Sequence, residues 1–299
     1  MKILVTGSSG FIGSELINFL KSLNQDIYTI GSKKKNNRNH FTLPKKEISK
    51  FFDKTLIQVK PDYIFHLAGD FNDVSIDYSL KVNCILTYEL LNSLEKIKSN
   101  KNIKVLIVGS AAEYGYVSRN KLPVTENTEI KPNTVYGISK SIQAHIVNQH
   151  MKSNKNIVYV RPFNVIGKGM SEKLSLGNFN KQINLIKKNK IKPRIILRNM
   201  HASRDFVDVK DAVEIFWKLI NTTLSFGKFI NICSGKSTKI RTILKYMIKK
   251  SDIKIDILLD KKNNTKDMSI YYGDNALLIK IIGKFKFTEW KSSVNDLML

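Results

Sequence analysis

The first half of the chain alternates short apolar runs with longer amphipathic ones. Short apolar runs predict strands, and runs with apolar positions three or four residues apart predict helices. The predicted strands are 3–6, 27–30, 62–68, 103–108 and 157–161, and the predicted helices are 11–23, 47–59, 80–97 and 135–152. Because the strands are apolar throughout and alternate with helices, the pattern indicates a parallel sheet with helices on both faces.

After Pro162 the alternation becomes looser. We expect a loop at 167–177, helices at 179–188, 209–220 and 238–250, and strands at 194–197 and 229–232. The polar, basic stretch 32–39 is also expected to be a loop. The predicted fold class is α/β: a doubly wound parallel Rossmann sheet with a smaller C-terminal lobe.

Composition and charge narrow the class of partner only a little. The 299 residues are 42% hydrophobic, which allows a sizeable core, and the formal net charge is +25. Such a charge favours anionic partners, such as nucleic acid, an anionic membrane or phosphorylated small molecules. The lysines are spread along the chain, however, so a general compositional bias explains the charge at least as well.

The two cysteines, Cys84 and Cys233, lie in apolar surroundings and are expected to be inert core thiols. No cysteines and histidines have the spacing of a metal site, so we predict no metal. The chain opens directly into a predicted strand and has no apolar stretch of about 18–20 residues, so we expect no signal peptide and no membrane anchor. A reducing cytoplasm fits these features.

A glycine-rich motif, Gly7-Ser8-Ser9-Gly10-Phe11-Ile12-Gly13, follows the first strand and opens the first helix. Glycines permit a tight turn and a close approach to a pyrophosphate, and a helix N-terminus attracts anions. The spacing G-x-x-G-x-x-G differs from the commoner dinucleotide pattern, but the strand–turn–helix context favours dinucleotide binding. The candidate contacts are Gly7, Ser9, Gly10, Phe11, Ile12 and Gly13.

The end of the second strand bears on the choice of cofactor. Dinucleotide folds that prefer NAD carry an acidic residue there, which holds the ribose hydroxyl. Here the chain reads Ile30-Gly31-Ser32-Lys33-Lys34-Lys35, with no carboxylate. Ser32 and Lys33 would suit a 2′-phosphate, so NADP(H) is favoured and NAD(H) stays possible; a solvated basic loop is the alternative.

Tyr136 and Lys140 lie four residues apart and so share one face of a predicted helix. A lysine ammonium there stabilises tyrosinate, which lets the pair move a proton to or from a carbonyl or alcohol oxygen. Tyr246 and Lys250 have the same spacing, but they lie on a late amphipathic helix and are expected to be surface or packing residues. Ser110 follows a strand at the sheet edge where ligands bind, and it can hydrogen-bond the reacting oxygen.

Together these motifs resemble the extended short-chain dehydrogenase/reductases, and the resemblance covers nearly the whole chain. The motifs that carry it lie at 6–13 (TGSSGFIG), 66–69 (HLAG), 83 (N), 110–115 (SAAEYG), 136–140 (YGISK), 161–164 (RPFN) and 204–209 (RDFVDV). The segments 109–115, 161–164, 202–206 and 229–235 are most similar to family members that reduce GDP-linked 4-keto-6-deoxymannose.

The resemblance implies a role for each matching residue. The implied catalytic residues are Ser110, Tyr136 and Lys140; the implied cofactor contacts add Leu67, Ala68, Tyr136 and Lys140; the implied substrate contacts are Ser110, Ala111, Glu113, Asn164 and Arg204. Arginine suits a diphosphate because its guanidinium binds phosphate oxygens bidentately. The resemblance also implies a homodimer, a dinucleotide-binding domain at 1–163 and about 206–232, and a substrate-binding lobe at about 164–205 and 233–299.

The expected activity is NADP(H)-dependent reduction of the C4 ketone of a nucleotide-linked 4-keto-6-deoxy sugar, with GDP favoured. The family segment after 161–164 usually reads His-x-Gly-Pro-Gly, and here it reads Val165-Ile166-Gly167-Lys168-Gly169, which leaves the sugar open. Ala111 and Ala112 stand where sugar 4,6-dehydratases carry acidic residues, and Glu113 is one residue away, expected on the other face of an extended segment.

The 3,5-epimerase-reductases need an additional Cys and His near the sugar, which this chain does not supply at the expected places, so this activity is not expected. Two alternatives then remain beside the reductase. A nucleotide-sugar 4-epimerase with retained NAD is the main alternative activity. A non-catalytic nucleic-acid binder would explain the charge, but the complete Ser110, Tyr136 and Lys140 set argues against nucleic acid as a partner.

Overall fold

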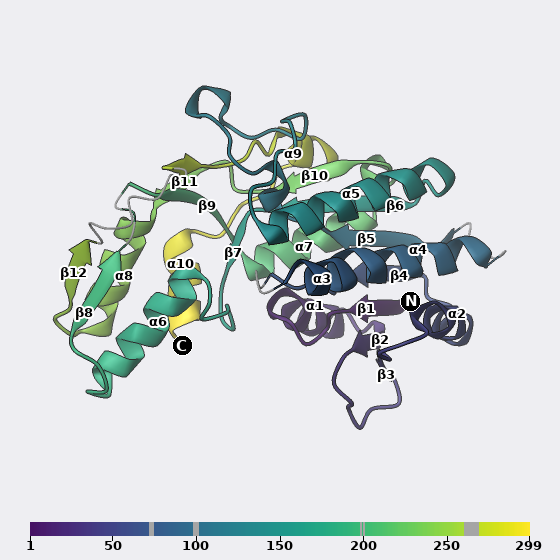
Figure 1. Ribbon diagram of the computed structural model, residues 1–299, viewed down its shortest axis with the longest axis horizontal. Helices are drawn as coiled ribbons and strands as arrows, with labels where there is room; N and C mark the ends of the chain where they lie inside the picture. The colour runs from purple at the N-terminus through teal and green to yellow at the C-terminus, as the bar shows by residue number, and fades with distance from the viewer. Residues whose placement is uncertain (72–74, 98–101, 198, 200, 260–268) are drawn as a thin grey trace.

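The computed structural model describes residues 1–71, 75–97, 102–197, 199, 201–259 and 269–299. Its main element is a seven-stranded, wholly parallel sheet with the strand order β10-β6-β5-β4-β1-β2-β3 (Figure 1). The strands are β1 (Lys2–Thr6), β2 (Asp26–Gly31), β3 (His40–Thr42), β4 (Tyr63–His66), β5 (Lys104–Val108), β6 (Ile157–Pro162) and β10 (Phe229–Ile232). The predicted fold class is confirmed.

Both faces of the sheet are apolar. Consecutive side chains of a strand point to opposite faces, and in these strands both sets are apolar. Ile3 and Val5 of β1 belong to the core on one face, whereas Leu4 belongs to the core on the other. Phe65 and Ile64 of β4 are divided between the two cores in the same way. This double burial explains why these strands appear in the sequence as continuous apolar runs.

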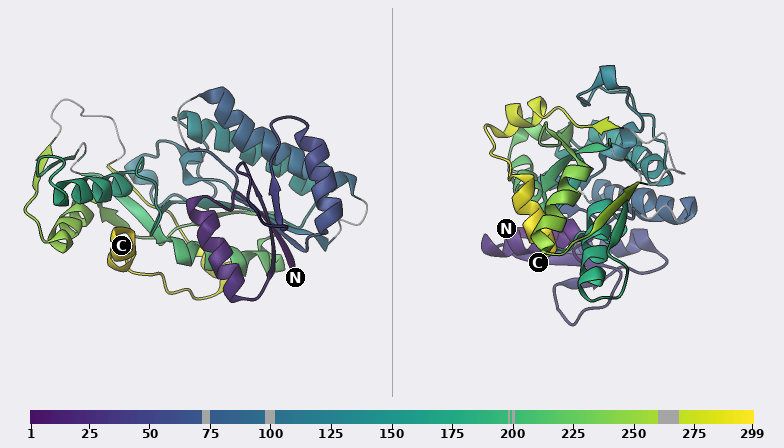
Figure 2. Two further views of the ribbon diagram at one scale, coloured as in Figure 1. Left: turned by 90° about the horizontal axis from the view of Figure 1, so that it is seen from below. Right: turned by 90° about the vertical axis from the view of Figure 1, so that its left-hand side faces the viewer.

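Helices cover both faces of the sheet, as the left view of Figure 2 shows. Helices α1 (Phe11–Ser22) and α7 (Val209–Ile220) pack together on one face. Helices α2 (Ile48–Val59), α4 (Leu86–Lys96) and α5 (Val135–Ser153) cover the other. Helices α1, α2, α5 and α7 begin and end within one residue of their predicted bounds, whereas α4 begins six residues after the start of the predicted helix 80–97.

The segment predicted as one helix at 80–97 is helical from Leu80 to Lys96 in two parts, and a short unpredicted helix precedes it. A short α3 (Ile76–Ser79) leads into a π-helical stretch, Leu80–Ile85, which continues into α4. The wider π turn contains the buried Asn83, whose side chain exchanges hydrogen bonds with the backbone of Asp70 at 2.8 and 3.0 Å. Such π turns often occur beside functional sites.

A second, smaller body is built mainly from the C-terminal part of the chain. Its larger sheet contains β11 (Ser237–Lys239), β9 (Ser203–Asp208) and β13 (Ile270–Tyr271), with β7 (Asn164–Ile166) also paired to β9. A separate pair joins β8 (Arg194–Leu197) to β12 (Asp256–Leu259). Its helices are α6 (Ser175–Lys187), α8 (Ile240–Ser251) and α10 (Trp290–Met298), while α9 (Ala276–Ile282) packs on α7 and β10.

Several of these elements were not predicted from the sequence, namely β3, β7, β9, β11, β12, β13, α9 and α10. Helix α6 also begins at Ser175, so the expectation of a loop through residue 177 is wrong. Gly177 lies inside that helix because the backbone of Ser171 packs against it: an added Cβ would lie 2.2 Å from the Ser171 oxygen. The division into two domains at the stated boundaries stays a prediction.

Candidate active site

A cavity of about 490 Å³ lies between the large sheet and the smaller body. On one side it is lined by residues at or just beyond the carboxyl ends of β1, β4, β5 and β6, including Gly7, Leu67, Gly109 and Pro162. Chain order reverses between β1 and β4, and open α/β sheets bind ligands at this kind of position. The opposite wall comes from β7, β9, β13 and the start of α6.

The glycine-rich loop occupies one end of this cavity, and its three glycines serve different purposes. Gly7 has φ +69° and contacts the end of β4 so closely that a Cβ would lie 2.6 Å from Ala68 N. Gly13 packs on the loop itself, where a Cβ would lie 2.2 Å from Gly7 O. Gly10 meets only one neighbouring atom, at 3.3 Å, and lines the cavity. The loop is therefore packed tightly against the end of β4 and the start of α1, and it is open towards the cavity.

The first turn of α1 is suited to an anion. Gly10 at the N-cap supplies no side-chain hydrogen bond, and the first turn contains no acidic residue. Phe11, Ile12 and Gly13 line the cavity beside it. Free N–H groups and the positive end of the helix dipole then face the space where a pyrophosphate would lie, so these residues fit a dinucleotide.

Four of the predicted cofactor contacts do not line this cavity. Ser9 is exposed, and Ala68 packs against Gly7 while its N–H donates to Thr6 Oγ1 at 3.1 Å. Ser32 and Lys33 lie in the exposed loop after β2, outside the lining residues. Their predicted contact with the adenosine phosphate stays a prediction.

The structure brings Ser110, Tyr136 and Lys140 together around the cavity. Ser110 follows β5, whereas the other two belong to the first turns of α5. The close approach depends on Gly137, because a Cβ there would lie 2.6 Å from Ala112 O. Without a side chain at this position, the start of α5 packs directly on the turn that follows Ser110.

The Ser110 hydroxyl lies at the cavity with its oxygen held by one backbone contact. Its oxygen accepts a hydrogen bond from Ala112 N at 3.1 Å and so caps the 3-10 turn Ala111–Tyr114. The hydroxyl proton is not used in that bond and remains available to an acceptor in the cavity. Ser110 can therefore donate to a carbonyl or alkoxide oxygen of a ligand.

Lys140 is almost completely buried, with 4% of its surface exposed. Its ammonium donates to Val108 O and to Gln143 Oε1, both at 2.9 Å. Burial lowers the pKa of Lys140 to about 8, although Glu113 and Cys84 favour its charged form. A lysine with a pKa near neutrality and a third N–H at the cavity is suited to proton chemistry.

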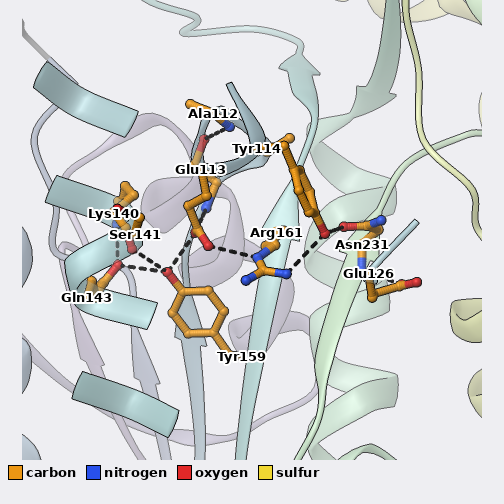
Figure 3. A network of polar contacts seen from close by, with 12 residues as sticks. Ala112, Glu113, Tyr114, Glu126, Lys140, Ser141, Gln143, Tyr159, Arg161 and Asn231 are labelled. Atoms are coloured by element: carbon orange, nitrogen blue, oxygen red, sulfur yellow. Dashed lines mark hydrogen bonds and ion pairs between the residues drawn. The ribbon is translucent and has the colours of Figure 1, made fainter. Parts of the chain in front are cut away.

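The Glu113 side chain does not line the cavity, and its predicted contact with substrate stays a prediction. The segment around it is a 3-10 turn rather than an extended one, and this turns the side chain into the protein interior. The fully buried carboxylate accepts hydrogen bonds from Ser110 N at 2.9 Å, Tyr159 Oη at 2.8 Å and Arg161 Nε at 2.7 Å (Figure 3). Burial raises the pKa of Glu113, and Arg161 and the hydrogen-bond donors oppose that rise.

Arg161 is the other half of this buried pair and was not recognised as structural from the sequence. It is 5% exposed and lies over the rings of Tyr114, Tyr159 and Phe229, with its guanidinium carbon 4.9 to 6.0 Å from their centroids. Arg161 also donates to Tyr114 Oη at 3.0 Å. The network therefore stiffens the wall behind Ser110.

The other predicted substrate contacts lie on the cavity wall: Ala111, Asn164 and Arg204. Asn164 donates through Nδ2 to Asp205 O at 2.9 Å, which directs its amide from β7 onto β9. Arg204 comes from β9 and is half-buried. Tyr271, which the sequence did not single out, also lines the cavity and donates to Ala111 O at 2.8 Å.

The residues predicted to be uninvolved lie where they were expected. Cys84 and Cys233 are both buried, and burial raises the pKa of the Cys84 thiol to about 11. Tyr246 packs edge-on against Trp290 and donates to Asn295 Oδ1 at 3.0 Å, away from the cavity lining.

Among the described residues, no group of three or more His, Cys, Asp or Glu side chains is arranged to hold a metal ion. No helix of the described segments has the length and apolarity to span a membrane.

Known proteins resemble this chain over almost all its length. The model of the NAD dependent epimerase/dehydratase family matches residues 3–233. GDP-6-deoxy-D-talose 4-dehydrogenase of Aggregatibacter actinomycetemcomitans is 32% identical over 305 residues, covering 99% of this chain and 97% of that protein. GDP-6-deoxy-D-mannose reductase of Pseudomonas aeruginosa is 25% identical over 266 residues, covering 87% and 83%. The structure of RMD from Pseudomonas aeruginosa complexed with NADPH matches with a TM-score of 0.82 and 23% identity, covering 99% and 96%.

The fold and these matches define the class of protein: an enzyme of the extended short-chain dehydrogenase/reductase type, as predicted. The chain belongs to the NAD dependent epimerase/dehydratase family.

Proposed function

We propose that this enzyme reduces the C4 ketone of a GDP-linked 4-keto-6-deoxy sugar, with NADP(H) as cofactor. The observation that carries the proposal is the meeting of Ser110, Tyr136 and Lys140 at one cavity beside the glycine-rich loop. The names of the two relatives, a GDP-6-deoxy-D-talose 4-dehydrogenase and a GDP-6-deoxy-D-mannose reductase, support both the GDP-sugar and the oxidoreductase chemistry.

In this proposal the three side chains act on the oxygen at C4. The Tyr136 hydroxyl gives its proton to the developing alkoxide, and the nearby Lys140 charge lowers the cost of forming the tyrosinate. Ser110 donates a hydrogen bond to the same oxygen, using the proton that the Ala112 contact leaves available. A bound nicotinamide would supply the hydride.

The diphosphate of the sugar nucleotide is assigned to the wall formed by the smaller body. Arg204 brings a permanent positive charge to the cavity, and Asn164 adds a polar amide. The remaining lining there is mostly apolar, including Phe163, Met170 and Phe206, which suits the methyl group of a 6-deoxy sugar.

The preference for NADP(H) is assigned to the loop that follows β2. His40 of β3 holds this loop, because its Nε2 donates to Lys33 O and its Nδ1 accepts from Thr29 Oγ1, both at 2.8 Å. These two bonds fix the tautomer, since a carbonyl can only accept. Lys33→Glu should raise the KM for NADPH about tenfold or more, because a like charge replaces the phosphate partner, and leave that for NADH nearly unchanged. An equal effect on both cofactors would contradict this assignment.

The activity test measures loss of reduced nicotinamide with GDP-4-keto-6-deoxymannose made in place. We expect one NADPH to be consumed per sugar. Tyr136→Phe should reduce the rate by roughly 10²–10⁴-fold, as for loss of a general acid. Tyr246→Phe is a matched control, because Tyr246 has the same spacing to a lysine but lies outside the cavity lining; it should leave the rate unchanged. A 4-epimerase with retained NAD would interconvert sugars without consuming NADPH, and this result would overturn the reductase proposal.

We also propose a homodimer formed through α4 and α5. These helices pack side by side and carry exposed apolar side chains: Tyr88 of α4 and Ile138 and Ile142 of α5 are 43%, 39% and 37% exposed. Ile85, the last residue of the π-helical stretch before α4, is 46% exposed. We assign these four residues to one apolar strip. A second copy would bury this strip as a four-helix contact. Sedimentation of Tyr88→Glu beside the wild type tests the proposal, and a monomeric wild type would refute it.

A further inference from the structure

The Lys140 ammonium is held from the protein side by two acceptors, one of which is a side chain. Val108 O is a fixed part of β5, whereas Gln143 Oε1 belongs to the next turn of α5. A lysine ammonium has three donors, so one N–H remains for the cavity. Gly69 leaves that side open, since a Cβ there would lie 3.3 Å from Lys140 Nζ.

The orientation of the Gln143 amide is fixed by its other contact. Lys140 can only donate, so the amide oxygen must face it and the amide nitrogen must face away. That nitrogen donates to Thr87 Oγ1 at 2.8 Å, and the Thr87 hydroxyl donates in turn to Asn83 O at 2.8 Å. The amide of Gln143 is therefore held in one orientation by partners on the neighbouring helix.

The same chain of hydrogen bonds continues to the end of β1. Because Thr87 has given its only proton to Asn83 O, the His66 Nε2 contact at 3.0 Å must be a donation by His66. His66 Nδ1 then accepts from Thr6 Oγ1 at 2.8 Å, directly before the glycine-rich loop. Gln143 thus links Lys140 to a fully buried, fully paired network that extends to β1.

We propose that Gln143 is a positioning residue, whose amide oxygen holds the Lys140 ammonium so that one N–H points into the cavity. The proposal rests on the proposed role of Lys140 beside Tyr136. The two lie on α5, one turn apart. Without the Gln143 oxygen, the buried ammonium would keep only one protein acceptor and would lose charge more easily as the pH rises.

The charged and titratable groups around Lys140 come from several elements. Glu113, on the turn after β5, and Cys84, on the π-helical stretch, both favour the ammonium electrostatically. His66 on β4 is neutral, because burial and then Lys140 lower its pKa to about 3. Gln143 is a neutral group that contacts Nζ directly, so its replacement changes the environment of Lys140 without removing a charge.

Two substitutions of opposite electrostatic effect test this role. Gln143→Met keeps the length but removes the acceptor, and Gln143→Glu places a carboxylate against the ammonium. The upper limb of the pH profile of kcat/KM, followed from about pH 6 to about pH 10, should move down by roughly one unit in Gln143→Met and up by at least that amount in Gln143→Glu. Near pH 9 Gln143→Met should be about tenfold less active than the wild type, and near pH 6.5 the two should agree within about threefold.

Gln149→Met and Gln149→Glu are the matched controls. Gln149 lies on the exposed side of α5 and also accepts from a lysine, Lys152, at 3.0 Å. These controls should leave the profile unchanged. A shift of the same sign in both Gln143 variants, or an equal loss of activity at every pH, would overturn the proposal by indicating a merely structural role.

A second measurement does not depend on the substrate. The lysine side-chain carbons can be followed by NMR, where Lys140, whose pKa burial lowers to about 8, should stand apart from a lysine with the model-peptide pKa of about 10.4. Its signal should disappear in Lys140→Arg and shift in opposite directions in the two Gln143 variants. If these shifts occur but no reductase activity is found, the proposed function fails and the positioning role stands. Unchanged titration in both variants refutes the positioning role.

Discussion

Replacement of Glu113 by glutamine should destabilise the protein far more than an isosteric change usually does. Three donors converge on the carboxylate, from Ser110 N, Tyr159 Oη and Arg161 Nε. A glutamine amide has one acceptor oxygen, and its NH₂ group must face either Arg161 or the pair of Ser110 and Tyr159. In both orientations a buried donor faces another donor, and the Arg161 charge loses its counter-ion.

The expected size of the effect follows from the burial of both partners. Glu113 is 0% and Arg161 5% exposed, and breaking a buried ion pair by removing one partner costs about 3–5 kcal/mol. Arg161 keeps the Tyr114 hydroxyl and the aromatic faces around it, which stabilise a cation. We therefore expect about 3 kcal/mol for Glu113→Gln and a value nearer about 5 kcal/mol for Glu113→Ala. At roughly 2–4 °C per kcal/mol, Glu113→Gln should lower Tm by about 6–12 °C.

Urea unfolding and thermal melting of the purified variants measure these losses. Glu172→Gln serves as the control, because Glu172 pairs with Lys181 at 2.7 Å with side chains 62% and 48% exposed. An exposed pair of this kind contributes about 0–1 kcal/mol. If Glu113→Gln lowers the free energy of unfolding by no more than about 1 kcal/mol, as expected for an exposed pair, the buried ion pair does not stabilise the wall behind Ser110.

Two further predictions concern other buried contacts. Burial lowers the pKa of His66 to about 3, so between about pH 6.5 and pH 3 the unfolded chain binds a proton at His66 that the folded chain does not. The contribution of neutral His66 to the free energy of unfolding is therefore fully present above about pH 6.5, and it should fall by up to roughly 5 kcal/mol as the pH drops towards 3. The urea midpoint should decline less steeply with falling pH in His66→Gln than in the wild type. An unchanged slope would show that protonation of His66 does not cause the loss of stability. In Gly109→Ala the added methyl would lie 2.3 Å from the Tyr159 ring, which should cost about 1–3 kcal/mol. Tyr159→Leu in the same chain should relieve that clash, and a double-mutant cycle without coupling would show that the two positions do not meet.

Much of the large sheet could be predicted because its elements are locally regular. The strands β1, β4, β5 and β6 are apolar on both faces, and the glycine motif falls between a clear strand and a clear helix. The smaller body was harder, because β7, β11 and β13 are only three, three and two residues long. Such short strands have no periodicity to detect, and they exist only through their pairing with β9.

The candidate site also contains some residues whose position could be predicted from the sequence and one whose position could not. Ser110, Tyr136 and Lys140 stand out by residue type and spacing, and all three line the cavity. Glu113 carries an equally polar side chain in the same motif, yet a 3-10 turn directs it inward to Arg161. Nothing in the local sequence distinguishes a carboxylate that faces a ligand from one that pairs with a buried arginine.

The sequence by itself determined the βαβ order, the glycine-rich turn and the Tyr–Lys pair, because these depend on residues close together in the chain. The tertiary structure alone decided which polar side chains meet. Arg161 reaches Glu113 across 48 residues, Gln143 reaches Thr87 across 56 and His66 reaches Thr6 across 60. The order of the strands brings these residues together, and a buried donor must then find an acceptor among whichever neighbours that order provides.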